Sequence, residues 1–142
     1  MLVLTLVLGC AKSPPGVVEV SGVVLLDGQP LPKAKVEFVP QLKDFGAEYN
    51  SVGITDDKGR FTLTCGNQKS GAVVGKHLVL ITDNIPGDFR RADGDTQGKL
   101  AQYLASLKNR PIPDGYSSIS KTPYPVEVTA DKKEYELTLT RK

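Results

Sequence analysis

The chain has 142 residues, which is enough for one domain with its own hydrophobic core. Its 18 Lys and Arg residues against 16 Asp and Glu residues give a net charge of +2, far below the positive charge that nucleic-acid binding requires. One His, two Cys and no Trp leave few of the side chains that build metal sites and general-base pairs, so we expect neither a nucleic-acid partner nor a cofactor.

The first ten residues, MLVLTLVLGC, form an apolar run that ends at Cys10. The run is too short for a membrane-spanning helix, which needs about 20 apolar residues, and it matches the apolar core of an export signal. The segment LVLGC also resembles the lipobox of bacterial lipoproteins, in which the signal is cleaved before the cysteine and lipid is attached to its thiol. This resemblance predicts that residues 1–10 are a lipoprotein signal peptide and that Cys10 is the lipidated residue.

Two alternatives remain open for this stretch: a buried first strand that ends in a core cysteine, and a disulfide between Cys10 and Cys65. Residues 11–16, AKSPPG, favour a short tether because proline and glycine do not continue regular structure. Ala11 stands where an Asp would signal retention at the inner membrane. We therefore expect export to the bacterial cell envelope and, in a host with two membranes, attachment to the outer membrane through the N-terminal lipid.

Residues 17–142 contain short β-branched and alternating segments that are separated by many of the 14 Gly and 10 Pro residues, which is typical of an all-β domain. In the clearest case, Ala34, Val36 and Phe38 alternate with charged residues. Cys65 falls on the apolar side of its strand, so we expect it to be buried. The predicted strands are residues 17–26, 33–39, two segments that form a hairpin through Asp56–Gly59, residues 76–82, and a last hairpin of residues 124–129 and 134–140.

One segment has helical periodicity instead. Leu100, Tyr103, Leu104 and Leu107 recur with the spacing of a single helix face, which predicts an amphipathic helix over Gln97–Lys108. We expect this apolar face to pack on the sandwich, over an edge or an open end, rather than on a membrane or a partner.

Three blocks in this order, VSGVVLLDGQPLPKAKVEFVP, GITDDKGRFTL and GAVVGKHLVLI, resemble the carboxypeptidase regulatory-like domain, a transthyretin-like or prealbumin-like β-sandwich. In the third block His77 stands where this family usually has an aromatic residue. The segment Ile112–Tyr116 is similar to one that precedes the last hairpin in small lipoproteins with this domain. The resemblance covers residues 17–142 and implies an all-β, seven-stranded antiparallel Greek-key β-sandwich with one short helical insert. Its motifs describe turns and core positions and say almost nothing about activity.

Catalytic residues are not expected. Ser70 and His77 could be drawn into a triad with an Asp, but the sequence has no nucleophile elbow of the type G-x-S-x-G. The hydrolase that shares the prealbumin fold, hydroxyisourate hydrolase, uses several His and Arg residues and a C-terminal tyrosine motif, whereas this chain has one His and ends in ELTLTRK. The basic pairs Arg90-Arg91 and Lys132-Lys133 are expected to be solvated rather than to clamp an anion.

The loop Asp93–Gly98 copies the first half of an EF-hand calcium loop, with Asp93, Asp95 and Gln97 as candidate ligands. The second half fails, because Leu104 occupies the position where a bidentate Glu is needed. A carboxylate that caps the N-terminus of the predicted helix explains the same residues without a metal, so no metal site is expected.

These observations predict a non-enzymatic, lipid-anchored module of the cell envelope with a structural, adhesive or ligand-presenting role. The alternative is a carbohydrate- or peptide-binding module at the cell surface, with an envelope protein or a glycan as partner. A transthyretin-like hydrolase is the least favoured function. The tyrosines that could bind a glycan or a peptide, or could equally belong to the core, are Tyr49, Tyr103, Tyr116 and Tyr124.

Overall fold

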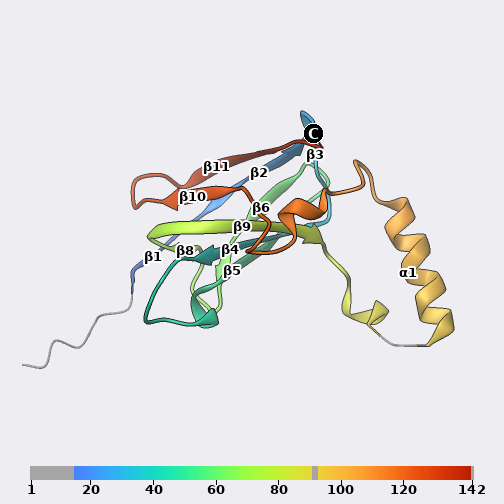
Figure 1. The fold of residues 1–142 in the computed structure, drawn as a ribbon, viewed down its shortest axis with the longest axis horizontal. Helices are drawn as coiled ribbons and strands as arrows, with labels where there is room; N and C mark the ends of the chain where they lie inside the picture. Colours follow the sequence, from blue (N-terminus) through green and yellow to red (C-terminus); the bar gives the residue numbers. More distant parts are fainter. Residues whose placement is uncertain (1–14, 91–92, 142) are drawn as a thin grey trace, which may run out of the picture.

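A computed structural model of the chain describes residues 15–90 and 93–141. Its regular secondary structure is mainly β-strand, arranged in two layers, with one helix standing beside them (Figure 1). The strands are β1 (Val17–Val18), β2 (Ser21–Leu26), β3 (Gln29–Pro30), β4 (Ala34–Pro40), β5 (Ser51–Ile54), β6 (Arg60–Thr62), β7 (Thr64–Cys65), β8 (Ala72–Val73), β9 (Gly75–Asp83), β10 (Pro125–Val128) and β11 (Glu134–Leu139). The helix is α1 (Gly94–Ser106), and the 3-10 turns are η1 (Ala47–Tyr49), η2 (Gly87–Phe89) and η3 (Asp114–Tyr116).

The two layers are open sheets. One is five-stranded and antiparallel in the order β10-β9-β4-β5-β7. The other is four-stranded, in the order β11-β2-β3, with β6 also paired to β2. A further short pair joins β1 to β8. This architecture agrees with the prediction of an all-β, sandwich-like fold with one helix, and the described residues form eleven strands, several of them only two residues long, where about seven were predicted.

Alternation with a period of two builds the core between the layers. Ala34, Val36 and Phe38 of β4 are fully buried, as predicted, while the residues between them remain half-buried on the outer face. Strands β2, β9 and β11 bury every second residue in the same way. Removing one such large aliphatic side chain from water stabilises the fold by roughly 2 kcal/mol. The core is therefore made by side chains that the pattern of the sequence already separates from the surface.

Phe38 lies at the centre of this core. Its ring centroid is 6.3 Å from that of Phe61, 5.6 Å from that of His77 and 6.4 Å from that of Tyr135. Strand pairing sets Gly22 directly between Phe61 and Tyr135. A Cβ atom at Gly22 would come within 2.0 Å of the Tyr135 carbonyl oxygen and 3.0 Å of the Phe61 ring. Only glycine therefore allows the two aromatic side chains to pack beneath β2.

Both predicted hairpins are wrong in their pairing, although their turns exist. Asp56 N donates to Arg60 O at 2.8 Å across a turn in which Gly59 has a φ of 76°, but β5 pairs with β4 and β7 whereas β6 pairs with β2. The turn thus carries the chain from one layer to the other.

The last two strands also enter different layers. Strand β10 pairs with β9, and β11 pairs with β2 in parallel, so the expectation of a wholly antiparallel fold is wrong at this pair. Tyr135 holds the connection, because its hydroxyl accepts from Thr129 N at 3.3 Å and donates to Lys132 O at 3.1 Å. A turn signal in the sequence locates a change of direction but does not say which sheet the next strand joins.

The helix lies in an excursion from the sandwich, which we define as residues 84–113. It begins three residues earlier than predicted, at Gly94, because Asp93 caps it there. The expectation that its apolar face packs on the sandwich is wrong: no residue of α1 is buried, and its Tyr103 ring stacks instead on Phe89 of the excursion, with the centroids 5.3 Å apart. Figure 1 shows α1 standing away from both layers.

Several predictions about the N-terminus fall on undescribed residues. The predicted signal peptide, residues 1–10 with Cys10, and most of the predicted tether, residues 11–16, lie outside the described residues. Cys65 is a free, buried thiol, as expected for a core position, and Cys10, its partner in the alternative disulfide, lies outside the described residues. Among the described residues, no helix is long and apolar enough to cross a membrane.

Candidate functional site

The candidate calcium ligands serve the helix. The Asp93 carboxylate accepts a hydrogen bond from Thr96 N at 2.8 Å, and the bonds from Thr96 hold the pKa of Asp93 below its usual value. Asp95 pairs with Lys99, one turn along, at 3.2 Å, and Gln97 is exposed on the same helix. The described part of the chain contains no group of three or more His, Cys, Asp or Glu side chains that could hold a metal ion. The capping interpretation therefore accounts for Asp93.

His77 is a core residue. Its side chain is 1% exposed, its Nε2 donates to Val73 O at 2.8 Å, and its ring packs against Phe38. The Nδ1 atom has no hydrogen-bond partner in the described structure. Burial lowers the pKa of His77 below 6.5, so the ring is neutral near pH 7. Ser70, its proposed partner in a triad, is exposed, so the two side chains do not share a solvent-facing site.

Tyr116 and Tyr124 close the free edge of β11. The Tyr124 hydroxyl accepts from Thr138 N at 3.0 Å and donates to Glu136 O at 3.5 Å. The Tyr116 hydroxyl likewise accepts from Thr140 N at 3.3 Å and donates to Thr140 O at 3.5 Å. An unpaired strand edge is a template for pairing with another chain, and these hydroxyls occupy it. Both tyrosines therefore act as structural edge caps.

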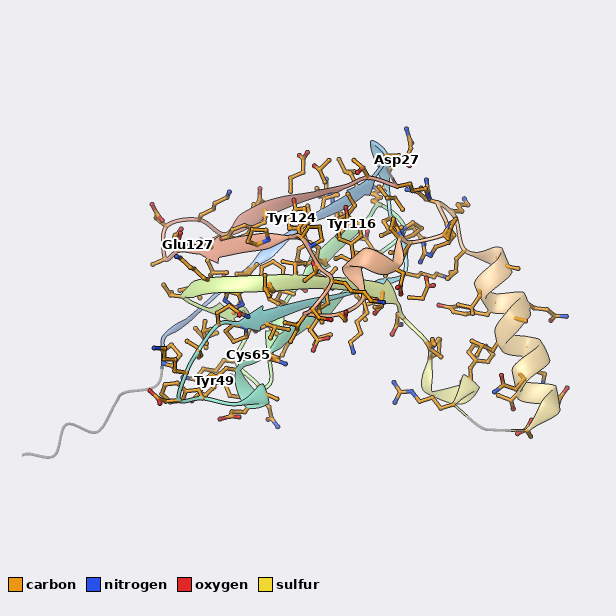
Figure 2. All side chains as sticks on the ribbon, viewed as in Figure 1. Asp27, Tyr49, Cys65, Tyr116, Tyr124 and Glu127 are labelled. Atoms are coloured by element: carbon orange, nitrogen blue, oxygen red, sulfur yellow. The ribbon has the colours of Figure 1, made fainter. Side chains whose placement is uncertain are left out.

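The other two tyrosines lie elsewhere. Tyr49 packs edge-on against Phe45, with the ring centroids 5.2 Å apart, and Figure 2 shows it well away from Tyr116 and Tyr124. Tyr103 stacks on Phe89 in the excursion, and both of these rings are half-buried. The tyrosines predicted to bind a ligand thus do not form one common surface.

The two pairs of adjacent basic residues also lie apart from each other. The Lys132 ammonium lies 4.8 Å from the centre of the Tyr135 ring, and Lys133 reaches Glu19 at 3.9 Å. Arg90 is exposed beside β5 and β9, and Arg91 lies outside the described residues. Neither pair forms a clamp for an anion in the described structure.

A polar network that sequence reasoning missed lies where the excursion rejoins the sandwich. Arg110 is at its centre, and its side chain is 11% exposed. Its guanidinium donates to the Asp83 carboxylate at 2.6 Å and to the carbonyl oxygens of Lys108 and Pro32, each at 2.7 Å. Arg110 thereby ties the end of the excursion to β9 and to the loop before β4.

Asn109 and Arg141 extend this network to the neighbouring turn and the C-terminal strand. The Asn109 amide donates to three carbonyl oxygens around the β2–β3 turn at 3.0 to 3.1 Å, and its backbone has a φ of 58°, which Asn tolerates better than most residues. Arg141 donates to Asn109 Oδ1 and to Asp27 Oδ2, both at 2.9 Å. No short motif marks these residues, because apart from Lys108 their partners lie 27 to 114 positions away in the chain. The network is a structural element that positions the excursion.

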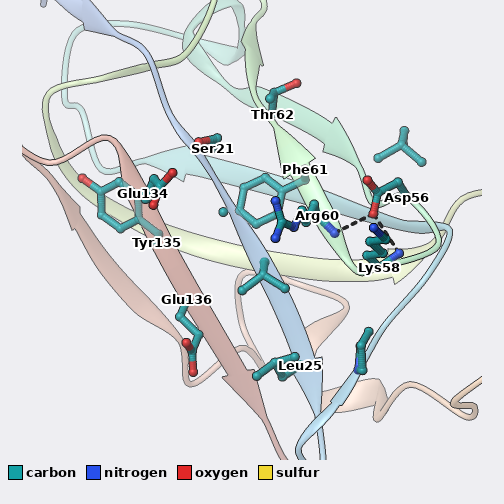
Figure 3. A pocket seen from close by; sticks show the side chains of 14 residues that line it. Ser21, Leu25, Asp56, Lys58, Arg60, Phe61, Thr62, Glu134, Tyr135 and Glu136 are labelled. Carbon is teal, nitrogen blue, oxygen red and sulfur yellow. Dashed lines mark hydrogen bonds between the residues drawn. The ribbon is translucent and has the colours of Figure 1, made fainter.

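A broad hollow lies on the outer face of the four-stranded sheet (Figure 3). It is open to solvent and has a volume of about 980 Å³. Its floor is β2, with the half-buried side chains of Val23 and Leu25, and it is bordered by β11 on one side and by β6 and the turn before β6 on the other. Sequence reasoning missed this face, although the uninterrupted apolar run VVLL in β2 indicates a strand that is apolar on both sides.

Asp56, on the border of the hollow, is held by hydrogen bonds within its own turn. Asp56 accepts from the backbone N atoms of Lys58 and Arg60, both at 2.9 Å, and these bonds lower the pKa of its carboxyl. Within the described chain the hollow therefore offers a broad, shallow contact surface with charged borders, without an enclosed pocket for a small substrate. No family model matches the sequence, and neither a curated protein nor a solved structure matches it.

Proposed function

We propose that the protein is a non-enzymatic, lipid-anchored module of the bacterial cell envelope, held at the membrane through Cys10, with a structural, adhesive or ligand-presenting role. The observation that carries this proposal is that the two ends of the sandwich differ. Strands β1 and β8 lie at one end of the sandwich, next to the first described residues, and the excursion with α1 stands at the other end (Figure 1).

An anchor at Cys10 would fix the orientation of the sandwich relative to the membrane. Residues 11–16 span at most about 20 Å when fully extended, so the β1 end would stay close to the lipid surface. The excursion would then point away from the membrane, with the half-buried rings of Phe89 and Tyr103 accessible to an envelope partner. The network around Arg110 supports such a role, because it holds the base of the excursion in one position. In a host with two membranes, we place the anchor at the outer membrane.

The finer fold assignment belongs to the same proposal. We assign the domain to the transthyretin-like, carboxypeptidase regulatory-like type, with the strand order of a Greek key. Two layers with facing apolar sides, the Gly59 turn and the contact of His77 with Phe38 support this assignment. The parallel pairing of β2 with β11 corrects the wholly antiparallel version of the expectation.

The experiment is metabolic labelling with a tagged fatty acid in cells that express the wild type, Cys10→Ala or Cys65→Ala. We expect label in the wild type and in Cys65→Ala, which changes the buried thiol, and none in Cys10→Ala. Only the labelled proteins should sediment with the membrane fraction. Equal labelling of the wild type and Cys10→Ala would overturn the anchor.

A second candidate function, recognition of a glycan or a peptide at the cell surface, rests on the stacked pair of Phe89 and Tyr103. Their rings are inclined by 27° and lie 5.3 Å apart on the excursion, and such rings offer a flat face to a sugar or an apolar side chain. Pull-down with peptidoglycan and a glycan array test it, with Phe89→Ala as the variant. Binding that is equal for the wild type and Phe89→Ala would remove this candidate.

A further inference from the structure

The outer face of the four-stranded sheet carries a regular arrangement of side chains across its strands (Figure 3). In both β2 and β11 the inward residues are more deeply buried than the residues between them, which places alternate residues on the outer face. Strand pairing then aligns these outward residues in three rows: Glu134–Ser21–Thr62, Glu136–Val23–Arg60 and Thr138–Leu25–Pro30. The middle residues of the three rows, Ser21, Val23 and Leu25 of β2, form a largely apolar column, in which Val23 and Leu25 are only half-buried.

The two borders of this face carry opposite charges. Glu134 and Glu136 are exposed on β11, and Arg60 and Lys58 are exposed on β6 and in the turn before it. Adjacent strands lie about 4.8 Å apart, so the backbones of β11 and β6 are separated by about 10 Å, with Val23 between them. Within residues 15–90 and 93–141, none of these four charged side chains lies within 4.0 Å of an opposite charge, and Arg60 and Lys58 attract the Asp56 carboxylate at longer range.

Asp56 and Asp57 are the acidic residues on the basic border, both in the turn before β6. The Asp56 carboxylate accepts hydrogen bonds from two backbone N–H groups, those of Lys58 and Arg60. These donors are neutral and leave the carboxylate charged, so the turn and β6 together carry two acidic and two basic side chains. The opposite charges that lie across the face from each other are therefore those of Glu136 and Arg60, at the two ends of the row through Val23.

We propose that this face binds a second copy of the chain about a two-fold axis that runs parallel to β2. Rotation about such an axis exchanges the two borders, so Glu136 of each copy faces Arg60 of the other, and Val23 packs against Val23. A two-fold axis perpendicular to β2 in the same plane would set Glu136 against Glu136, so the charges select the parallel axis. The face is thus complementary to itself, as the interface of a symmetric dimer must be.

The physical form of this contact is that of two sheets packed face to face. Such sheets lie about 10 Å apart with their side chains interdigitated, and the open hollow provides the room for the side chains of the partner. The apolar column supplies buried area, and the borders supply register and specificity. The tyrosine-capped edge of β11 favours pairing through this face over edge-to-edge pairing.

The dimer does not depend on the lipid anchor, but it is compatible with one. An axis parallel to β2 leaves the β1 ends of both copies on the same side and both α1 helices at the other end. Two chains attached to one membrane can adopt this symmetry without detaching. The dimer would then present two excursions that both point away from the lipid.

The test is sedimentation velocity of the full chain carrying Cys10→Ser, so that no lipid or detergent adds mass, from about 1 μM to about 100 μM. We expect a concentration-dependent dimer. Glu136→Arg and Arg60→Glu should each raise the dissociation constant at least about tenfold, because each reversal places two like-charge pairs in the symmetric interface. An equimolar mixture of the two variants should form a heterodimer of wild-type affinity, since every pair is again of opposite sign.

Matched control reversals lie on the other sheet. Glu127→Arg and Lys76→Glu change exposed charges on β10 and β9 and should leave the dimer unchanged. Circular dichroism of each variant checks that it is folded. A wild type that stays monomeric at about 100 μM overturns the proposal. So does a dimer that survives both interface reversals, or a mixture of the two variants that remains monomeric. Loss of fatty-acid labelling at Cys10 would overturn the anchor and leave this proposal standing.

Discussion

Replacing Arg110 with Ala is expected to lower the free energy of unfolding by about 3 kcal/mol. The side chain is 11% exposed and donates at 2.6 to 2.7 Å to Asp83, Lys108 and Pro32. A buried hydrogen bond that involves a charged group contributes about 1.5 to 3 kcal/mol, and we take about 1 kcal/mol for each bond because Asp83, at 35% exposed, can regain water. In a domain of this size the loss corresponds to a fall in Tm of about 10 °C.

Urea unfolding followed by circular dichroism measures this loss, and two further variants make the result specific. Arg110→Lys keeps the positive charge beside Asp83 but lacks the planar fork that reaches both carbonyl oxygens, so it should lose about half as much. Arg90→Ala removes an exposed arginine of the excursion and should stay within about 0.5 kcal/mol of the wild type. An Arg110→Ala protein that unfolds within about 0.5 kcal/mol of the wild type would refute the structural role of the network.

Three further predictions follow from the core and the strand edge. His77 is kept neutral by burial, whereas the unfolded chain takes up a proton as the pH falls below 6.5, so the free energy of unfolding should fall by up to about 1.4 kcal/mol per pH unit. Urea titrations between about pH 7 and pH 5 should show this slope in the wild type and a shallower one in His77→Phe. Gly22→Ala should cost about 3 kcal/mol in thermal unfolding, because its Cβ atom would meet the Tyr135 carbonyl oxygen, whereas Gly98→Ala in α1, with open space around it, should be neutral or stabilising. Tyr124→Phe should cost about 1 kcal/mol and speed hydrogen exchange at the Thr138 amide, which loses its acceptor. Unchanged exchange at that amide would contradict the edge-cap role.

Local features of the sequence determined much of the molecule. Alternation in β4 placed Ala34, Val36 and Phe38 in the core, and the Gly59 turn formed where the sequence indicated. The helix is capped by Asp93, which is the interpretation that competed with a calcium site. Each of these features depends on neighbours within a few residues, so the periodicity of side chains and the chemistry of a single turn or cap are sufficient to predict it.

Only the tertiary structure decided which strands pair and where the exposed surfaces lie. The turns at Asp56–Gly59 and between β10 and β11 each connect different sheets, because a strand pairs with whichever neighbour completes its buried layer. The same long-range pairing aligns Glu136, Val23 and Arg60 across the outer face. Arg110 finds Asp83 27 positions away, and α1 stands off the sandwich with its Tyr103 ring stacked on Phe89 within the excursion. These contacts are set by three-dimensional packing, which the spacing of residues along one chain does not encode.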